Sequence, residues 1–138
     1  AGWSGFLIPG YELVAPADAT VVAKLRAAGA VILGQTNLPD FAASDGNISS
    51  AFGRTGDAYD WRFSPGGSSG GTVTAIAANM ALIGNGTDTG NSIRMPSANT
   101  YSLAAVVTRT FKVLLEMSSV VMCSQLPPAS VRSFGVSS

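Results

Sequence analysis

The 138-residue sequence contains no histidine and a single cysteine, and Lys24 and Lys112 are its only lysines. Without histidine, a Ser-His-Asp triad is impossible. With Cys123 as the one thiol, zinc sites of histidine and cysteine are excluded and a disulfide scaffold is disfavoured, so we expect no metal and no cofactor. A serine nucleophile in this chain would therefore need a lysine, a second serine that relays to a lysine, or a carboxylate as its base.

Charge is also scarce: charged residues make up 12% of the chain, and eight acidic residues balance eight basic ones. No basic cluster is present, so nothing points to nucleic acid or to an anionic membrane as a partner. The longest apolar stretches are interrupted by Asn79 or by charges between residues 109 and 116, so no membrane-spanning segment is expected. Neither an oligomeric state nor a targeting signal is indicated, and the cytoplasm is the default expectation.

Two glycine-framed serine motifs stand out in what is present. Residues 66–71 read Gly-Gly-Ser-Ser-Gly-Gly and residues 86–94 read Gly-Thr-Asp-Thr-Gly-Asn-Ser-Ile-Arg, so Ser68 and Ser92 lie 24 positions apart. Glycine lets a substrate approach the main chain closely, and such loops can aim several N–H groups at one point. The pattern therefore indicates catalysis. A phosphate-cradling loop is the weaker interpretation, because no Gly-Lys-Ser/Thr follows either motif.

These motifs and the helix-strand pattern over residues 19–37 resemble the amidase signature family, serine hydrolases that cleave carboxamide C–N bonds with a Ser-cisSer-Lys triad. The resemblance covers about residues 15–99, with both serine motifs in the family's order and spacing. It implies that Ser92 is the nucleophile, and that Ser68, held in a cis peptide, passes protons between the nucleophile and a lysine.

The segment around Ser92 is short, small and polar, so its backbone N–H groups can converge on the oxygen of a tetrahedral intermediate. The expected oxyanion hole consists of Thr89, Gly90, Asn91 and Ser92. Asn91 stands where the family usually has a glycine, and asparagine tolerates left-handed backbone angles better than most residues. We therefore expect the hole to be retained.

Three further residues are expected to support the site. The resemblance gives Asp88 and Arg94 a structural role beside the nucleophile loop, and a surface salt bridge is the alternative. Ser69 is expected to steady the loops by hydrogen bonds rather than to react.

The resemblance also implies a catalytic lysine upstream of Ala1, because in the family this lysine lies farther from the cis serine than the 67 residues that precede Ser68 here. Lys24 falls on a helix that matches a non-catalytic segment. Beyond the family-like stretch, residues 101–138 form a divergent tail. Residues 1–138 are thus expected to be a partial amidase domain that lacks its start and has a replaced end.

Three functions follow from this interpretation. The first is an amidase that hydrolyses a small-molecule amide through a serine nucleophile and an acyl-enzyme. The second is a glutaminase that resembles the A subunit of an amidotransferase, built on the same core. The third is a non-catalytic truncated fragment.

The expected fold class is α/β: part of the amidase signature α/β/α fold, with a mixed twisted sheet covered by helices. The spacing of apolar residues predicts a helix that opens near Pro16 and ends at Gly29, and then a buried strand over residues 31–34. A helical turn over 37–43, a loop over 44–65, a buried helix over 72–80 and a strand over 81–84 follow. We expect six aromatic residues to pack between the layers, with Phe41 or Phe52 as candidate acyl-pocket residues: Trp3, Phe6, Phe41, Phe52, Trp61 and Phe63.

Overall fold

The computed structural model describes residues 15–100 and 120–123. Helices and strands are mixed along the chain, which confirms the α/β class, and each is short. In sequence order the elements are α1 (Thr20–Ala27), β1 (Val31–Gln35), the 3-10 turn η2 (Asp40–Ala42), β2 (Ile48–Ser49), β3 (Gly53–Arg54), α2 (Gly70–Ala77), β4 (Ile83–Gly84), α3 (Arg94–Asn99) and β5 (Val120–Cys123).

The main sheet has the strand order β1-β5-β4, and β5 is antiparallel to both neighbours. Strands β1 and β4 are therefore parallel to each other and end at the same edge of the sheet. Ile32 and Ile83 both have Met122 as their register partner, and the β1 register shifts by a bulge between Ile32 and Gly34. The central strand, β5, lies at residues 120–123, where no strand was expected from the residue pattern.

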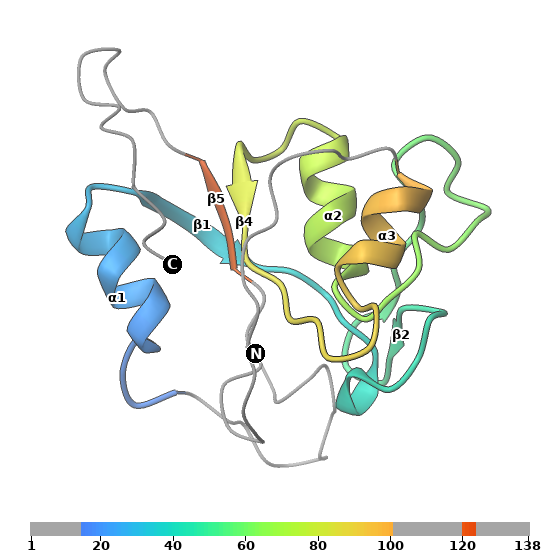
Figure 1. Cartoon of the computed structure of the whole chain (residues 1–138), viewed down its shortest axis with the longest axis horizontal. Helices are drawn as coiled ribbons and strands as arrows, with labels where there is room; N and C mark the ends of the chain where they lie inside the picture. Colours follow the sequence, from blue (N-terminus) through green and yellow to red (C-terminus); the bar gives the residue numbers. More distant parts are fainter. Residues whose placement is uncertain (1–14, 101–119, 124–138) are drawn as a thin grey trace.

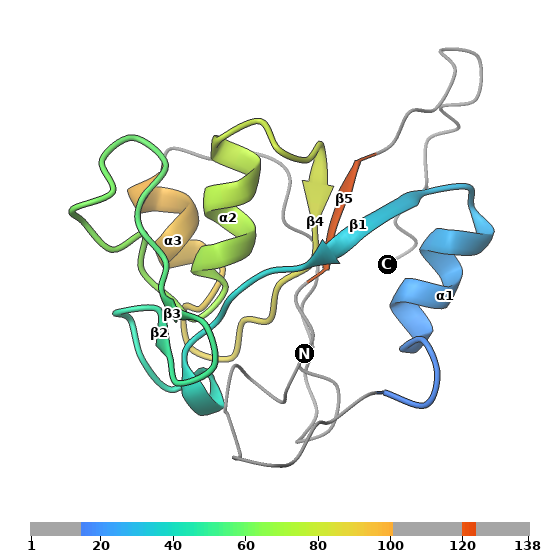
Figure 2. The ribbon, with the colours of Figure 1, turned by 180° about the vertical axis from the view of Figure 1, so that it is seen from behind.

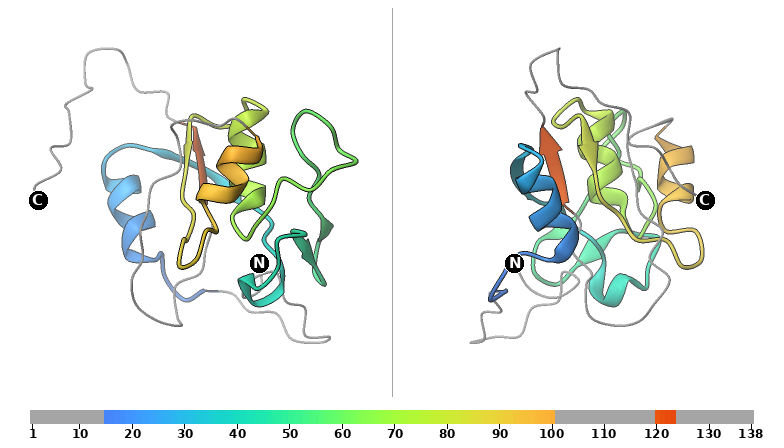
Figure 3. Two further views of the ribbon diagram at one scale, coloured as in Figure 1. Left: turned by 45° about the vertical axis from the view of Figure 1, so that its right-hand side comes forward. Right: turned by 60° about the vertical axis from the view of Figure 1, so that its left-hand side comes forward.

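Helices lie on both sides of this sheet. Helix α1 covers one side, and α2 and α3 lie on the other, as two views of the ribbon show (Figure 1 and Figure 3). On the α1 side, Val22 is buried among residues of its own helix and Ile32 of β1. A sheet with helices on both sides is thus present, but both strand pairs described in it are antiparallel, so the expected mixed sheet is not seen here. The described residues form too small a part of the α/β/α fold to show the whole of it.

Helices α1 and α2 end in the same way. Each is followed by a strand, β1 after α1 and β4 after α2, and these two strands run in the same direction. At the end of α1, Gly29 N donates to Arg26 O and Ala30 N donates to Leu25 O, both at 3.0 Å, with Gly29 at φ +87°. This is a Schellman motif, and it confirms the predicted end of the helix at Gly29. Helix α2 repeats the motif with Asn79 at φ +57° in the glycine position.

The sheet is less buried than the sequence predicts. The buried strand expected over residues 31–34 is wrong in that respect, because Val31 and Leu33 are each 53% exposed. The reason is geometric: α1 packs against Ile32, whose side chain points to the opposite face from its neighbours, and α2 contacts β4 and β5 instead.

The expected aromatic packing is also wrong for the described residues. Exposed fractions run from 62% to 74% for four of them: Phe41, Phe52, Trp61 and Phe63. Phe41 lies on η2 and Phe52 in the turn of the β2–β3 hairpin, which Figure 2 shows below α2, whereas Trp61 and Phe63 lie on the loop between β3 and α2. No neighbouring layer covers these loops. Trp3 and Phe6 lie outside the described residues. In the described part of the chain, no helix is long and apolar enough to cross a membrane.

Close packing at the start of α2 yields the first prediction. An alanine Cβ at Gly71 would lie 2.2 Å from the carbonyl oxygen of Asn37, whereas one at Gly90 would meet nothing within 4 Å. Alanine favours a helix over glycine by about 1 kcal/mol, but a backbone clash of this kind outweighs it. We expect Gly71→Ala to lower the free energy of unfolding by about 1 to 3 kcal/mol and Gly90→Ala to change it by less than about 0.5 kcal/mol in urea unfolding. A Gly71→Ala chain as stable as the wild type would contradict this packing.

Candidate active site

Ser69 joins the two serine motifs. Its hydroxyl accepts a hydrogen bond from Thr87 N at 3.1 Å and donates one to Thr87 O at 3.2 Å. Its backbone N–H donates to Ser92 O at 3.0 Å. Ser69 is 1% exposed, so these bonds are formed away from water. The structure therefore places the loop that carries Ser92 directly against the loop that carries Ser68.

Ser68 is buried beside this junction. The Gly67–Ser68 peptide bond is cis, which is the geometry that the family resemblance implies for this serine. Space around it is tight, since a Cβ on Gly67 would lie 2.4 Å from Ser44 O. Ser68 is 2% exposed and its hydroxyl has no hydrogen-bond partner within the described residues. The direct hydroxyl contact that a proton relay to Ser92 would use is not formed in this structure.

Helix α2 begins next to Ser69, but its first amides are already occupied. Asn47 is fully buried and, in the amide orientation that its neighbours require, its oxygen accepts from Gly71 N at 2.9 Å and from Gly70 N at 3.2 Å. This bonding caps the helix, whose N-terminus leaves such groups unsatisfied. The N–H groups of Gly70 and Gly71 are therefore not free to bind a negative charge at the serines. Sequence reasoning missed Asn47, which lies in a segment with the ordinary composition of a loop.

Asp88 and Arg94 close the loop that carries Ser92. One carboxylate oxygen of Asp88 accepts from Ile93 N at 3.2 Å, from Arg94 N at 3.1 Å and from Arg94 Nε at 3.0 Å, and the other accepts from the guanidinium at 3.1 Å. The guanidinium also donates to Gly90 O. The Asp88 side chain is 9% exposed and that of Arg94 is 71% exposed. The pair is thus neither fully buried nor a free surface salt bridge: it ties both ends of the loop together.

The same bonds determine which way one candidate oxyanion donor points. In a trans peptide unit the carbonyl and the N–H point in opposite directions, so binding Gly90 O to Arg94 turns the N–H of Asn91 away from the guanidinium. Thr89, Gly90 and Asn91 are exposed and Ser92 is half-buried. Asn91 is not among the described residues with positive φ, so the left-handed tolerance considered from the sequence is not used. Its side chain instead donates to the sulfur of Met95 at 3.9 Å.

Thr72 ties α2 to the edge where β1 and β4 end. Its hydroxyl donates to Asn85 O at 3.0 Å, so the 2.7 Å contact with the Thr36 hydroxyl has Thr36 as donor. Thr36 follows β1 directly and Asn85 follows β4. The chain that leads to Ser92 thus leaves β4 at Asn85, which Thr72 holds beside the end of β1. This is the edge of the sheet where α/β proteins usually bind ligands.

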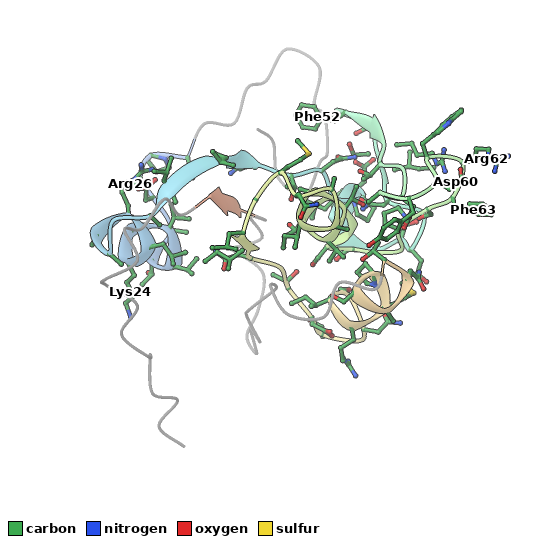
Figure 4. All side chains as sticks on the ribbon, turned by 90° about the horizontal axis from the view of Figure 1, so that it is seen from above. Lys24, Arg26, Phe52, Asp60, Arg62 and Phe63 are labelled. Atoms are coloured by element: carbon green, nitrogen blue, oxygen red, sulfur yellow. The ribbon has the colours of Figure 1, made fainter. Side chains whose placement is uncertain are left out.

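No described lysine reaches the serines. Lys24 is exposed on α1, on the other side of the sheet from α2 and α3, and Figure 4 shows its side chain extending away from the sheet. Lys112 lies outside the described residues. Within residues 15–100 and 120–123, no group of three histidine, cysteine or acidic side chains could hold a metal ion.

Comparison with known proteins places this arrangement in a family. The family model described as Amidase matches residues 11–102, so the chain belongs to the amidase family. Relatives include the A subunit of glutamyl-tRNA(Gln) amidotransferase from Burkholderia cenocepacia (strain HI2424), 50% identical over 92 residues, and that from Symbiobacterium thermophilum, 51% identical over 94 residues. The two alignments cover 67% and 68% of this chain, and 18% and 19% of the relatives. The chain thus spans less than a fifth of the length of these relatives.

The junction at Ser69 yields the second prediction. Ser69→Ala leaves the partly buried N–H and carbonyl of Thr87 without their partner, so we expect the free energy of unfolding to fall by about 1 to 3 kcal/mol. Ser97→Ala is the matched control, because the Ser97 hydroxyl on α3 makes no hydrogen bond within the described residues, and we expect a change below about 0.5 kcal/mol. Equal urea midpoints for the two variants would show that Ser69 does not join the loops.

The third prediction concerns acid stability. The Arg94 guanidinium lowers the pKa of Asp88 from 3.8 to about 2, chiefly by direct hydrogen bonds, against the opposing effect of burial. A lowered carboxyl pKa stabilises the folded chain above the unfolded pKa, and this stability is lost as pH falls from about 4 to about 2. Because Arg94 is largely exposed, we expect a loss of about 1 kcal/mol rather than the full effect of the shift. We expect the free energy of unfolding of Asp88→Asn, measured with urea at about pH 4 and about pH 2, to lack this loss. A wild-type chain with the same pH profile as Asp88→Asn would contradict the assignment.

Proposed function

We propose that this chain carries the nucleophile part of an amidase site, in which Ser92 attacks the carbonyl carbon of a carboxamide. The observation that carries the proposal is the junction at Ser69, which holds the Ser92 loop against the cis serine in a chain that belongs to the amidase family. Attack by Ser92 Oγ forms a tetrahedral intermediate, which collapses to an acyl-enzyme as the C–N bond breaks and the nitrogen takes a proton. Water then releases the acid.

In this proposal the residues beside Ser92 stabilise the negative oxygen. The N–H groups of residues 89–92 are the candidate donors, and the bond from Arg94 to Gly90 O fixes the peptide unit that carries the Asn91 N–H. Loss of one such donor typically costs about 3 to 4 kcal/mol of transition-state stabilisation. A Cβ at Gly90 would meet no described atom within 4 Å, so none of the described residues crowds this position.

Proton transfer needs a base that the described residues do not supply. Ser68 would relay the Ser92 proton to a lysine, as the family resemblance implies, and the unpartnered Ser68 hydroxyl is consistent with a further group binding at that point. Without that base we expect the isolated chain to react slowly. The same observation favours the second candidate, a chain that is non-catalytic alone. The amidotransferase names of the relatives extend the proposal to release of ammonia from an amide substrate, as one subunit of a larger enzyme.

The test supplies the base from solution. The purified chain is treated with a fluorophosphonate, which reacts with activated serines, at about pH 9 with and without n-butylamine as a substitute for the lysine side chain, and intact mass is followed. We expect one adduct, formed faster with the amine. Ser92→Ala should form none, and Ser68→Ala should lose at least about 100-fold of the amine-stimulated rate, the usual worth of positioned acid-base groups. Ser97→Ala should match the wild type. An adduct that persists in Ser92→Ala, or a folded chain that does not react with amine present, would overturn the proposal.

A further inference from the structure

The side chain of Asn85 is a buried donor without a partner. Asn85 is 8% exposed, and its Nδ2 has no hydrogen-bond partner in the described part of the chain. The Ser68 hydroxyl is the other buried side-chain group there that lacks one. Burying a donor unsatisfied typically costs about 1 to 3 kcal/mol, and such groups in folded proteins normally have a partner. Because Ser68 and Asn85 belong to the two loops that Ser69 joins, one additional group could contact both.

The backbone of Asn85 is held by a hydrogen bond to its own carbonyl and by the close packing of the residue after it. Its carbonyl accepts from Thr72, and the next residue, Gly86, packs so tightly against Ser69 that a Cβ there would lie 2.7 Å from the Ser69 hydroxyl oxygen. Ser68 directly precedes Ser69, and Asn85 directly precedes Gly86. The two unsatisfied groups therefore lie within one residue of the same contact, at the edge where β1 and β4 end.

The chemistry of the two groups shows that one base cannot satisfy both. An amide Nδ2 only donates hydrogen bonds. A neutral lysine amine has one lone pair, and the Ser68 hydroxyl uses it when the amine acts as the base, so a lysine head group opposite Ser68 leaves Asn85 unsatisfied. Asn85 needs an acceptor such as a carbonyl oxygen. A peptide segment that contains a lysine offers both: a basic nitrogen for Ser68 and a backbone carbonyl for Asn85.

We propose that Asn85 is a positioning residue, which donates a hydrogen bond to a backbone carbonyl of the segment that brings the general base to Ser68. The inference rests on the proposed function for the role of that base. Asn85 touches neither the substrate nor the reacting atoms in this scheme. It aligns the base through the backbone, so that the lysine nitrogen meets the Ser68 hydroxyl.

The test compares two soluble bases on the same chain. Nα-acetyl-lysine N-methylamide carries an amine and two amide carbonyls, whereas n-butylamine carries the amine alone. In the fluorophosphonate reaction we expect the lysine derivative to act at about tenfold lower half-maximal concentration than butylamine, the effect of one hydrogen bond of ordinary strength. In Asn85→Leu the two compounds should differ by about twofold or less, with the value for butylamine unchanged. Asn85→Asp, which keeps the size but loses the donor, should behave like Asn85→Leu. An undiminished preference in Asn85→Leu would overturn the inference.

A second measurement does not depend on reactivity. The side-chain amide signal of Asn85 in 15N-labelled chain, assigned by its loss in Asn85→Leu, should shift when the lysine derivative is added and should not shift with butylamine. A signal that shifts while neither amine promotes labelling would mean that the Asn85 interaction exists and the proposed function fails. A signal unmoved by the derivative would mean that solvent satisfies Asn85 and the inference is wrong, whatever the labelling shows.

Discussion

The arrangement of the site depends on one buried side chain. Ser69 binds Thr87 through its hydroxyl and Ser92 through its backbone, and no hydrophobic cluster joins the two serine loops in the described residues. If the Ser69 side chain turned away, the N–H and the carbonyl of Thr87 would lose their hydrogen bonds at the same time, so we expect these bonds to form and break together. The bonds to Ser69 fix the position of the loop that carries Ser92, and the Asp88–Arg94 pair determines the conformation within that loop.

Polar packing, more than an apolar core, holds this part of the chain together. Around α2, the buried side chains of Asn47, Ser69 and Thr72 each bond a neighbouring backbone or hydroxyl group. Hydrogen bonds of this kind are directional, so they fix loop geometry more narrowly than apolar contacts do. Their disadvantage is that a buried polar group left without a hydrogen-bond partner lowers the stability of the folded chain. Ser68 and Asn85 are the two places where the described residues carry that cost.

The sequence predicted the parts that depend on local chemistry. The end of α1 at Gly29, the strand that follows and the helix after the first serine motif are present, with α2 beginning at Gly70. The pairing of Asp88 with Arg94 also follows from two charges near each other in a charge-poor segment. What the sequence could not show depends on distant contacts. Asn47 caps a helix that begins 23 positions later, and β5 pairs with strands from which it is far separated in the chain. The assignment of Ser92 and Ser68 as catalytic residues remains a proposal.

The two apolar clusters of the described residues do not meet. One surrounds Val22 on the α1 side, and the other consists of Ala75 and Ala81 on the α2 side, with the sheet between them. Regions that share few buried contacts open independently, each with its own free energy. Helix α1 therefore reaches the loops at Ser69 through β1, by way of the Thr36 and Thr72 hydroxyls, and not through a shared apolar core. We expect a substitution on the exposed face of α1 to lower the stability of that helix more than it disturbs the serine loops.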